Sequence, residues 1–225
     1  MGHKVHPKSF RLAVTKDWDA TWFASKDAFR QNLREDVSIR RFLKKALKDA
    51  LVDRIVIDRS RGILAVNVHA GKPGIVIGRG GAGIEELVKK IKGEFFRGRK
   101  VNLTVNVKEI AQPSLSASLI GQQIAADIEK RMPFRRSMKM AIERVLKSGA
   151  EGVKITIGGR LNGAEIARVE TLASGKIPLH NLRADIDFAR ETAYTIYGTI
   201  GIKVWVNRGE KFAAKTAAQA EARAA

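Results

Sequence analysis

The sequence lacks cysteine and long apolar segments, and each absence excludes a class of protein. Without cysteine, disulfide bonds and thiolate metal sites are excluded. No apolar run approaches the roughly 20 residues that a membrane-spanning helix needs. The start, "MGHKVHPKSF", has no long apolar core of the kind found in secretory signals. We therefore expect a cytoplasmic protein.

Acidic residues are also scarce relative to basic ones. The chain of 225 residues has 42 Lys and Arg against 23 Asp and Glu, which gives a formal net charge of +19. Such an excess predicts a polyanionic partner. Because the basic residues are spread over the whole chain and no segment is long enough to span a bilayer, we predict that this partner is nucleic acid rather than a membrane surface.

The first half of the chain combines helical and strand patterns. Residues 34–52 have apolar side chains at helical spacing, beginning with Val37, Phe42 and Leu43, and basic side chains on the other side. A second amphipathic helix is predicted after residue 83. The strands predicted around that helix are residues 54–58, 63–69 and 101–107. The last strand alternates perfectly, so we expect one buried face and one face in water.

Six glycines fall within thirteen residues, 71–83, just before the second helix. The run Gly78–Gly83 satisfies G-x-G-x-x-G, the dinucleotide fingerprint. Its first four residues, "GRGG", also satisfy the G-x-x-G of KH modules, which clamps a nucleic-acid backbone. A dinucleotide site needs a preceding buried strand and, about 20 residues later, an acidic residue that holds the ribose. Here only "IVI" is available as that strand, and "GRKVNLTV" offers no carboxylate.

The KH interpretation fits the residues better. A tight loop between two helices lets backbone N–H groups approach phosphates, and glycine removes the Cβ obstacle. The order helix, strand, strand, helix, loop, helix, strand is also the type II KH arrangement. A plain glycine-rich turn is the structural alternative. The candidate RNA-binding residues of this loop are Lys72, Gly78, Arg79, Gly80 and Gly81.

Pro113 separates a second α+β domain from the first. Ser114 is the predicted N-cap of a helix that reaches about Arg131, and a second helix ends at Gly149. The pattern then changes to a period of two, which predicts a four-stranded, mostly antiparallel sheet. Its predicted strands are residues 151–159, 164–173, 183–194 and 200–206.

Two groups of basic residues lie outside the glycine loop. Residues 1–20 show no sustained period and are predicted to form an irregular arm, whose candidate RNA-binding residues are Lys4, His6, Lys8 and Arg11. The second group lies where the two helices of the second domain meet, and it consists of Arg131, Arg135, Arg136 and Lys139. An ordinary solvated surface is the alternative for this second group.

The sequence offers no clear catalytic or metal site. No Ser/His/Asp set with a local signature is present, so we predict no catalytic residue and no cofactor. Asp185 and Asp187 are spaced so that they could hold Mg²⁺ as in a nuclease. We favour the wet face of a strand, or ion pairs with the many arginines, as the explanation of these two carboxylates.

Six segments resemble, in the same order, those of one protein family. The opening "MGHKVHPKSFRLAV" resembles the family's "GQKVHPxGxRLG". The others are "PGIVIGRGG", "FRRSMKMAIE", "GGRLNGAEIARVE", "GKIPLHNLRADIDFA" and "YGTIGIKVWV". On these segments, which extend over residues 1 to about 210, the chain resembles bacterial small-subunit ribosomal protein three. The loop "GRGG" departs from this family, which often has a lysine pair there.

The resemblance implies a structural RNA-binding protein on the head of the small ribosomal subunit of a bacterium, bound to ribosomal RNA. It implies that Arg135, Arg136 and Lys139 face incoming messenger RNA in the channel where it enters and help to unwind it. The implied neighbours are small-subunit proteins ten and fourteen, with proteins four and five across the channel. The expected divisions are a basic arm at 1–20, a type II KH domain at 21–111, a C-terminal α+β domain at 112–209 and a solvated tail at 210–225.

Two other functions stay open. A nicotinamide-dependent oxidoreductase would use the Gly78–Gly83 run, and a free KH-type RNA chaperone would use the same loop without joining the ribosome. Sedimentation separates the chaperone from the ribosomal protein, because a free chaperone stays at the top of a gradient.

Overall fold

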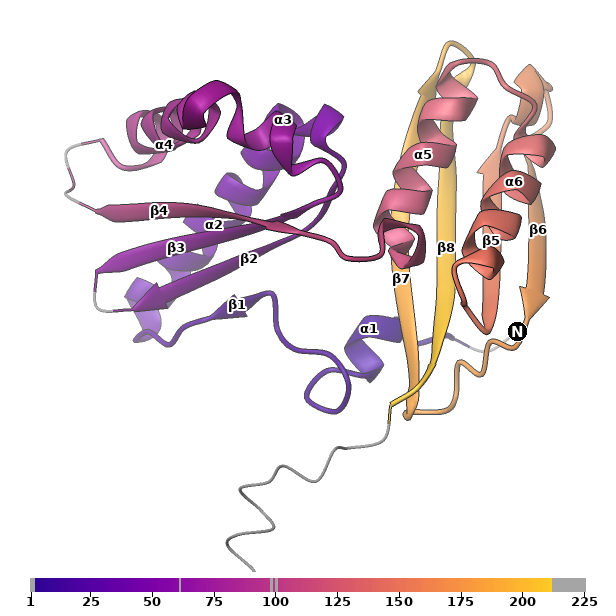
Figure 1. Cartoon of the computed structure of the whole chain (residues 1–225), viewed down its shortest axis with the longest axis horizontal. Coiled ribbons are helices and arrows are strands. Elements are labelled where there is room, and N and C mark those ends of the chain that lie inside the picture. Colours follow the sequence, from indigo (N-terminus) through magenta and orange to yellow (C-terminus); the bar gives the residue numbers. More distant parts are fainter. Residues whose placement is uncertain (1–2, 61, 98, 100, 212–225) are drawn as a thin grey trace, which may run out of the picture.

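The computed structural model describes residues 3–60, 62–97, 99 and 101–211 of the chain. It contains two units, each with helices packed on a four-stranded sheet (Figure 1). The predicted α+β fold class is confirmed. Of the predicted tail, residues 212–225 lie outside the described residues. Within the described part of the chain, no helix has both the length and the apolar character needed to cross a membrane.

The first unit has the predicted type II KH order of elements. Its sheet has the strand order β1-β2-β3-β4, in which β2 and β3 are antiparallel and β4 lies parallel to β3. The elements that form the α-β-β-α-α-β pattern are α2 (Lys26–Ala46), β2 (Val52–Ser60), β3 (Ile63–Ala70), α3 (Pro73–Ile77), α4 (Ala82–Phe95) and β4 (Asn102–Glu109).

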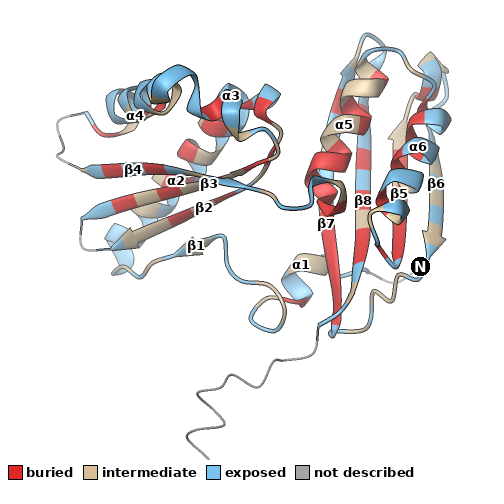
Figure 2. Cartoon of the chain, viewed as in Figure 1, coloured by how far each residue is buried: buried red, intermediate tan, exposed pale blue. Residues whose placement is uncertain are grey.

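The core of this unit lies between its helices and one face of its sheet. Ile39 and Leu43 of α2 and Leu87 and Ile91 of α4 belong to one buried cluster with the apolar side chains of the strands. Strand β4 alternates between buried and exposed residues, as predicted, and Figure 2 shows the buried stripes. The opposite face of the sheet therefore meets water.

Helix α2 differs from its prediction in extent and in its buried residues. It begins at Lys26 rather than at residue 34 and ends at Ala46. Val37 is 37% exposed, so its place in the predicted apolar stripe is wrong. The neighbouring Asp36 is buried instead, and it accepts hydrogen bonds from Trp22 Nε1 (2.8 Å) and Arg59 Nη2 (2.6 Å). Where a helix packs through a buried carboxylate, the apolar periodicity is interrupted and cannot predict which residues are buried.

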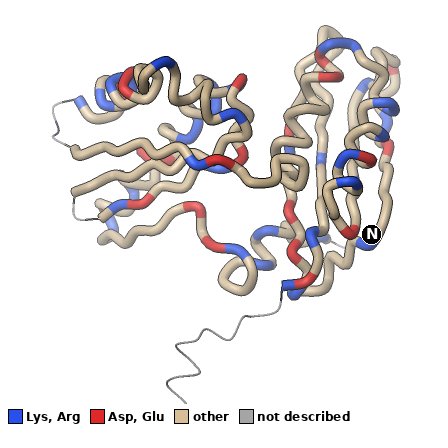
Figure 3. The backbone as a smooth tube through the Cα atoms, viewed as in Figure 1, with Lys and Arg blue, Asp and Glu red and all other residues tan. Residues whose placement is uncertain are grey.

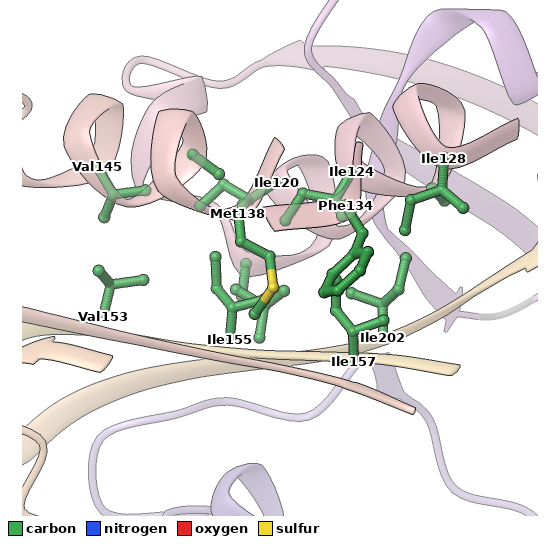
Figure 4. Packing of buried hydrophobic residues seen from close by; sticks show 14 of the residues in the cluster. Ile120, Ile124, Ile128, Phe134, Met138, Val145, Val153, Ile155, Ile157 and Ile202 are labelled. Atoms are coloured by element: carbon green, nitrogen blue, oxygen red, sulfur yellow. The ribbon is translucent and has the colours of Figure 1, made fainter. Parts of the chain in front are cut away.

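The second unit places two helices on one face of an antiparallel sheet with the strand order β6-β5-β8-β7, as predicted. Figure 4 shows Ile124 and Met138 of the helices facing Ile155 and Ile157 of the sheet. The elements of this unit are α5 (Ala117–Glu129), α6 (Phe134–Lys147), β5 (Gly152–Gly159), β6 (Arg168–Gly175), β7 (Ala184–Thr195) and β8 (Gly198–Glu210).

Two predicted boundaries in this unit are corrected. The N-cap of α5 is Ser116 rather than Ser114, because residues 113–115 form a separate 3₁₀ turn, and Ser116 Oγ accepts from Leu119 N. The strand predicted from residue 164 begins at Arg168. The chain before it turns through Asn162 and Gly163, both with positive φ, so pairing with β5 starts later.

The N-terminal segment is more regular than predicted, and it contacts both units. Its short helix α1 (Pro7–Phe10) packs against β7, the edge strand of the second sheet. Its strand β1 (Ala20–Thr21) pairs in parallel with β2 at the edge of the first sheet. The units also meet directly, because Gln122 Nε2 donates to the Val52 carbonyl (2.7 Å).

Candidate nucleic-acid interface

The glycine stretch forms the turn between two helices. Helix α3 ends at Ile77, and α4 begins at Ala82. Gly78, Gly80 and Gly81 have φ values of +71°, +58° and +87°, a region that glycine adopts without strain. The helix–loop–helix setting that a G-x-x-G loop requires is therefore present.

The glycines of this turn have two different roles. A Cβ on Gly78 would lie 2.9 Å from Gly83 N, and one on Gly83 would lie 2.6 Å from the Val76 carbonyl oxygen. These two residues are therefore small so that α3 and α4 can approach closely. A Cβ on Gly80 or Gly81 would meet nothing within 4 Å. The backbone of these two residues is open to a ligand.

This geometry argues against a dinucleotide site. The "IVI" segment, the strand candidate before the glycines, belongs to helix α3, and β3 already ends at Ala70. A dinucleotide fingerprint places its glycines in the turn that directly follows a parallel strand. Here the glycines follow a helix, so the Gly78–Gly83 run matches the sequence pattern of that fingerprint but not its structural position.

Positive charge surrounds the loop. Lys72 precedes α3, Arg79 lies within the loop, and both side chains are exposed. Figure 3 shows that α4 carries lysines as well as glutamates, so the positive charge beside the loop comes mainly from Lys72 and Arg79. The N-cap of α4 is Gly81, which has no side chain to cap the helix, so the positive end of the helix dipole is left for a ligand. The loop can offer both N–H groups and cations to a phosphate.

The structure separates the candidates of the arm. Lys4 is exposed. His6 packs edge-on against Phe188, with 4.9 Å between ring centroids. Burial, followed by nearby cations, lowers the pKa of His6, so its ring is neutral at pH 7. Lys8 pairs with Asp187 at 3.3 Å. Only part of the arm is therefore a free cationic surface.

The structure corrects the prediction that Arg11 binds RNA, because this residue is 0% exposed. Its guanidinium donates to the carbonyl oxygens of Pro7 (3.2 Å), Leu179 (3.2 Å), Asn181 (2.7 Å) and Ala184 (2.7 Å). These bonds attach the arm to the start of β7 and keep the cation away from solvent. The prediction that Arg11 binds RNA is not compatible with this burial, and its role is structural.

The second basic group lies at the start of α6 and in the loop before it. All four members, Arg131, Arg135, Arg136 and Lys139, are exposed. The opposite face of α6 is anchored in the core through Phe134 and Met138, which are 5% and 0% exposed. The group therefore sits on a rigid support.

Arg135 has a carboxylate partner that sequence reasoning missed. Its Nε and Nη2 donate to Oε2 and Oε1 of Glu170 on β6, at 2.9 and 2.8 Å. This hydrogen bonding raises the pKa of Arg135 and lowers that of Glu170, so both groups are charged at neutral pH. No local pattern signals a pair whose members are 35 residues apart.

The two aspartates that were considered as metal ligands are ion-pair partners. Asp185 lies 2.6 Å from Lys16 Nζ and 2.9 Å from Lys211 Nζ, and Asp187 lies 3.1 Å from Arg208 Nη2. Both carboxylates are buried, so the wet-face interpretation is wrong. The ion-pair interpretation is confirmed, although most of the partners are lysines rather than arginines. Among the described residues, no three His, Asp or Glu side chains are grouped to hold a metal ion.

Both units match known sequence families. Residues 38–115 match the KH domain, and residues 124–206 match the family described as "Ribosomal protein S3, C-terminal domain". A curated relative from Leuconostoc citreum (strain KM20), named small ribosomal subunit protein uS3, is 49% identical over 214 residues, which cover 93% of this chain and 96% of the relative. This chain belongs to the uS3 family.

Two further uS3 relatives agree. The protein from Pelotomaculum thermopropionicum is 48% identical over 97% of this chain and 95% of its own length. The protein from Caldicellulosiruptor saccharolyticus is 48% identical over 97% of both chains. The resemblance to small-subunit ribosomal protein three is confirmed. Because the uS3 family consists of ribosomal proteins rather than enzymes, the oxidoreductase alternative is wrong.

Proposed function

We propose that this chain is a structural component of the small ribosomal subunit that binds ribosomal RNA and also contacts messenger RNA. The observation that carries the proposal is its 49% identity, over 93% of its length, to a small ribosomal subunit protein uS3. On this proposal the chain lies on the head of the subunit beside proteins ten and fourteen. Proteins four and five then lie across the channel where messenger RNA enters.

Ribosomal RNA binding is assigned to the glycine loop and to the exposed part of the arm. Gly80 and Gly81 leave space in front of the backbone, and Arg79 and Lys72 add exposed positive charge beside it. Lys4 is the exposed cation of the arm. Phosphate contacts of this kind fix position and orientation on RNA without selecting a sequence.

Messenger RNA binding is assigned to the basic group on α6. Arg136 and Lys139 are three residues apart on this helix and so share one face. Arginine and lysine can hold a phosphate backbone without reading bases, which suits a messenger of any sequence. Because the helix is anchored by buried Phe134 and Met138, the cations keep fixed positions while the messenger passes.

Changing Arg135, Arg136 and Lys139 together to alanine tests the messenger assignment. We expect small subunits of normal abundance and sedimentation, because the messenger that these side chains are proposed to bind is a transient partner. Translation through a stable messenger hairpin should slow, whereas an unstructured messenger should be read almost normally. A reconstituted translation assay that compares the two messengers measures this difference.

The matched control changes Arg144 and Lys147 to alanine. These are two exposed cations nearer the other end of the same helix. This variant should translate both messengers normally. Equal slowing of the two messengers by the triple variant, or no slowing, would contradict the messenger assignment. A triple variant that fails to join the subunit would show that these cations bind ribosomal RNA or a neighbouring protein.

Glu170→Gln should tighten the binding of single-stranded RNA about two- to fivefold at low salt. The carboxylate holds the Arg135 guanidinium and repels an approaching phosphate, and the neutral amide does neither as strongly. Fluorescence anisotropy measures the affinity, and the gain should shrink at high salt because this pair of an exposed arginine and a half-buried glutamate lies at the surface, where salt screens charges. Glu109→Gln, which neutralises an exposed carboxylate at the end of β4, is the control. Weaker binding would mean that Glu170 is needed to orient Arg135.

A further inference from the structure

A cavity of 420 Å³ lies at one end of the second unit, beside the basic group of α6. Three connections form it: the α5–α6 loop, the β5–β6 connection and the β7–β8 hairpin, which Figure 1 shows together at the top of this unit. The side chains of its lining that matter here are Arg131, Phe134, Arg160, Tyr194 and Tyr197. Its volume falls in the range that single small ligands occupy.

The aromatic wall of this cavity is held in place and yet exposed. Tyr197 is 56% exposed, and its ring packs on Gly163, where a Cβ would come within 2.9 Å of the ring. Arg160 lies over the same ring at 5.8 Å and donates to the Tyr197 carbonyl. Tyr194 is 70% exposed, and its N–H donates to Glu129 Oε1 at 3.0 Å. Neither ring is buried in the core, so the exposed part of each ring remains available to stack on a ligand.

The charges that line the cavity favour an anionic ligand. Arg131 and Arg160 are its cations, and Glu129 is its carboxylate. Glu129 already accepts the Tyr194 N–H and lies 3.7 Å from Lys48 Nζ, so little of its negative charge is left uncompensated. Exposed aromatic rings beside arginines are the combination that binds unpaired nucleotides, because the rings stack on the base and the cations attract its phosphate.

The cavity is continuous with the basic group on α6. Arg131 belongs to both, and Phe134, which lines the cavity, directly precedes Arg135. A strand of RNA whose backbone lies on Arg135 and Arg136 would therefore have a neighbouring base within reach of the tyrosines.

We propose that this cavity binds one unpaired base of a single-stranded RNA by stacking on Tyr197, with Tyr194 as a second wall. The inference rests on the proposed function for the location of the RNA backbone. It adds a contact to the base itself, which the cations of α6 do not make. The RNA that supplies this base is either messenger or ribosomal RNA, because the chemistry of the base is the same in both.

The experiment measures the affinity of the full chain for two labelled probes by fluorescence anisotropy. One probe is a single-stranded RNA of twelve uridines, and the other has the same backbone without bases. Tyr197→Ala should weaken binding of the uridine RNA by about tenfold and leave the abasic RNA unchanged. Tyr197→Phe should bind both probes like the unchanged protein, since the ring is kept. Phe23→Ala removes an aromatic ring that is 98% exposed in the first unit and should change neither affinity.

The two proposals fail in different ways in this assay. The stacking inference is overturned if Tyr197→Ala weakens both probes alike or weakens neither, with the far-UV circular dichroism unchanged. The α6 assignment fails separately if the Arg135, Arg136 and Lys139 triple variant binds both probes normally. A crosslink from 4-thiouridine in messenger on assembled subunits to the 194–197 hairpin identifies messenger as the source. A crosslink to 4-thiouridine in ribosomal RNA instead identifies that RNA, and a crosslink to neither contradicts the inference.

Discussion

Replacing Gly80 and Gly81 with aspartate should weaken RNA binding by roughly 30-fold while the fold stays intact. The space in front of both residues is open, so the new side chains meet no protein atom within 4 Å at Cβ, and aspartate is one of the few residues that adopt a positive φ. They bring two negative charges to the place where we propose a phosphate lies. Each charge costs about 1 kcal/mol against a phosphate a few ångströms away in water. The two charges together cost about 2 kcal/mol, which corresponds to a roughly 30-fold loss of affinity. A filter-binding assay with small-subunit ribosomal RNA measures it.

Asparagine at the same two positions is the matched control. It has nearly the same shape, tolerates positive φ and carries no charge. We expect a much smaller loss of affinity than with aspartate. If aspartate leaves the affinity unchanged, the loop does not bind RNA in this protein, and RNA is held by the arm and the second unit.

Gly83→Ala should lower stability rather than act through charge, because its Cβ would meet the Val76 carbonyl at 2.6 Å and disturb the packing of α3 on α4.

Arg11→Met should lower the free energy of unfolding of the second unit by about 3 kcal/mol. The change removes four hydrogen bonds between a buried cation and backbone carbonyls. It also releases the arm from β7, which α1 contacts. Arg11→Lys should lose most of the same stability, because an ammonium cannot reproduce the planar fork of donors. Urea unfolding followed by far-UV circular dichroism gives the loss.

Lys4→Met is the control for Arg11→Met, since it removes the same charge from an exposed position in the same arm. It should change the stability by less than about 0.5 kcal/mol. Similar losses for the two variants would indicate that net charge, rather than the buried hydrogen bonds, determines the effect.

The order of elements was predictable because apolar periodicity is strong in most of them. Leu103 and Val105 alternate with polar residues, and Ile124 and Ile128 repeat at helical spacing, so local sequence specifies both type and buried face. The first turns of α2, residues 26–33, were missed because their side chains are exposed or half-buried and no apolar stripe marks them. Further along the helix, Asp36 rather than Val37 is buried, and it binds Arg59 from a distant strand. A pattern of apolar residues cannot signal packing through an ion pair.

Some residues of the candidate site could likewise be predicted from the sequence, and others could not. The G-x-x-G loop and the cations of α6 are contiguous in sequence, so their composition alone drew attention to them. The burial of Arg11 and the pairing of Arg135 with Glu170 depend on segments that meet only in three dimensions. Basic composition suggested RNA contact for every cation, and it could not distinguish one that bonds to backbone carbonyls from one that faces solvent.

The bonds of Arg11 have a consequence for how the protein is made. Arg11 leaves the translating ribosome early, but its acceptor at Ala184 lies 173 residues later in the chain. At about 5–20 residues per second, roughly 9–35 s pass before that acceptor is synthesised. During this interval the KH unit can fold from its own residues, while the arm has no second sheet to bind. The N-terminal segment is thus among the first to be synthesised and among the last to reach its final place, and a chain that stops before residue 179 leaves it without its anchor.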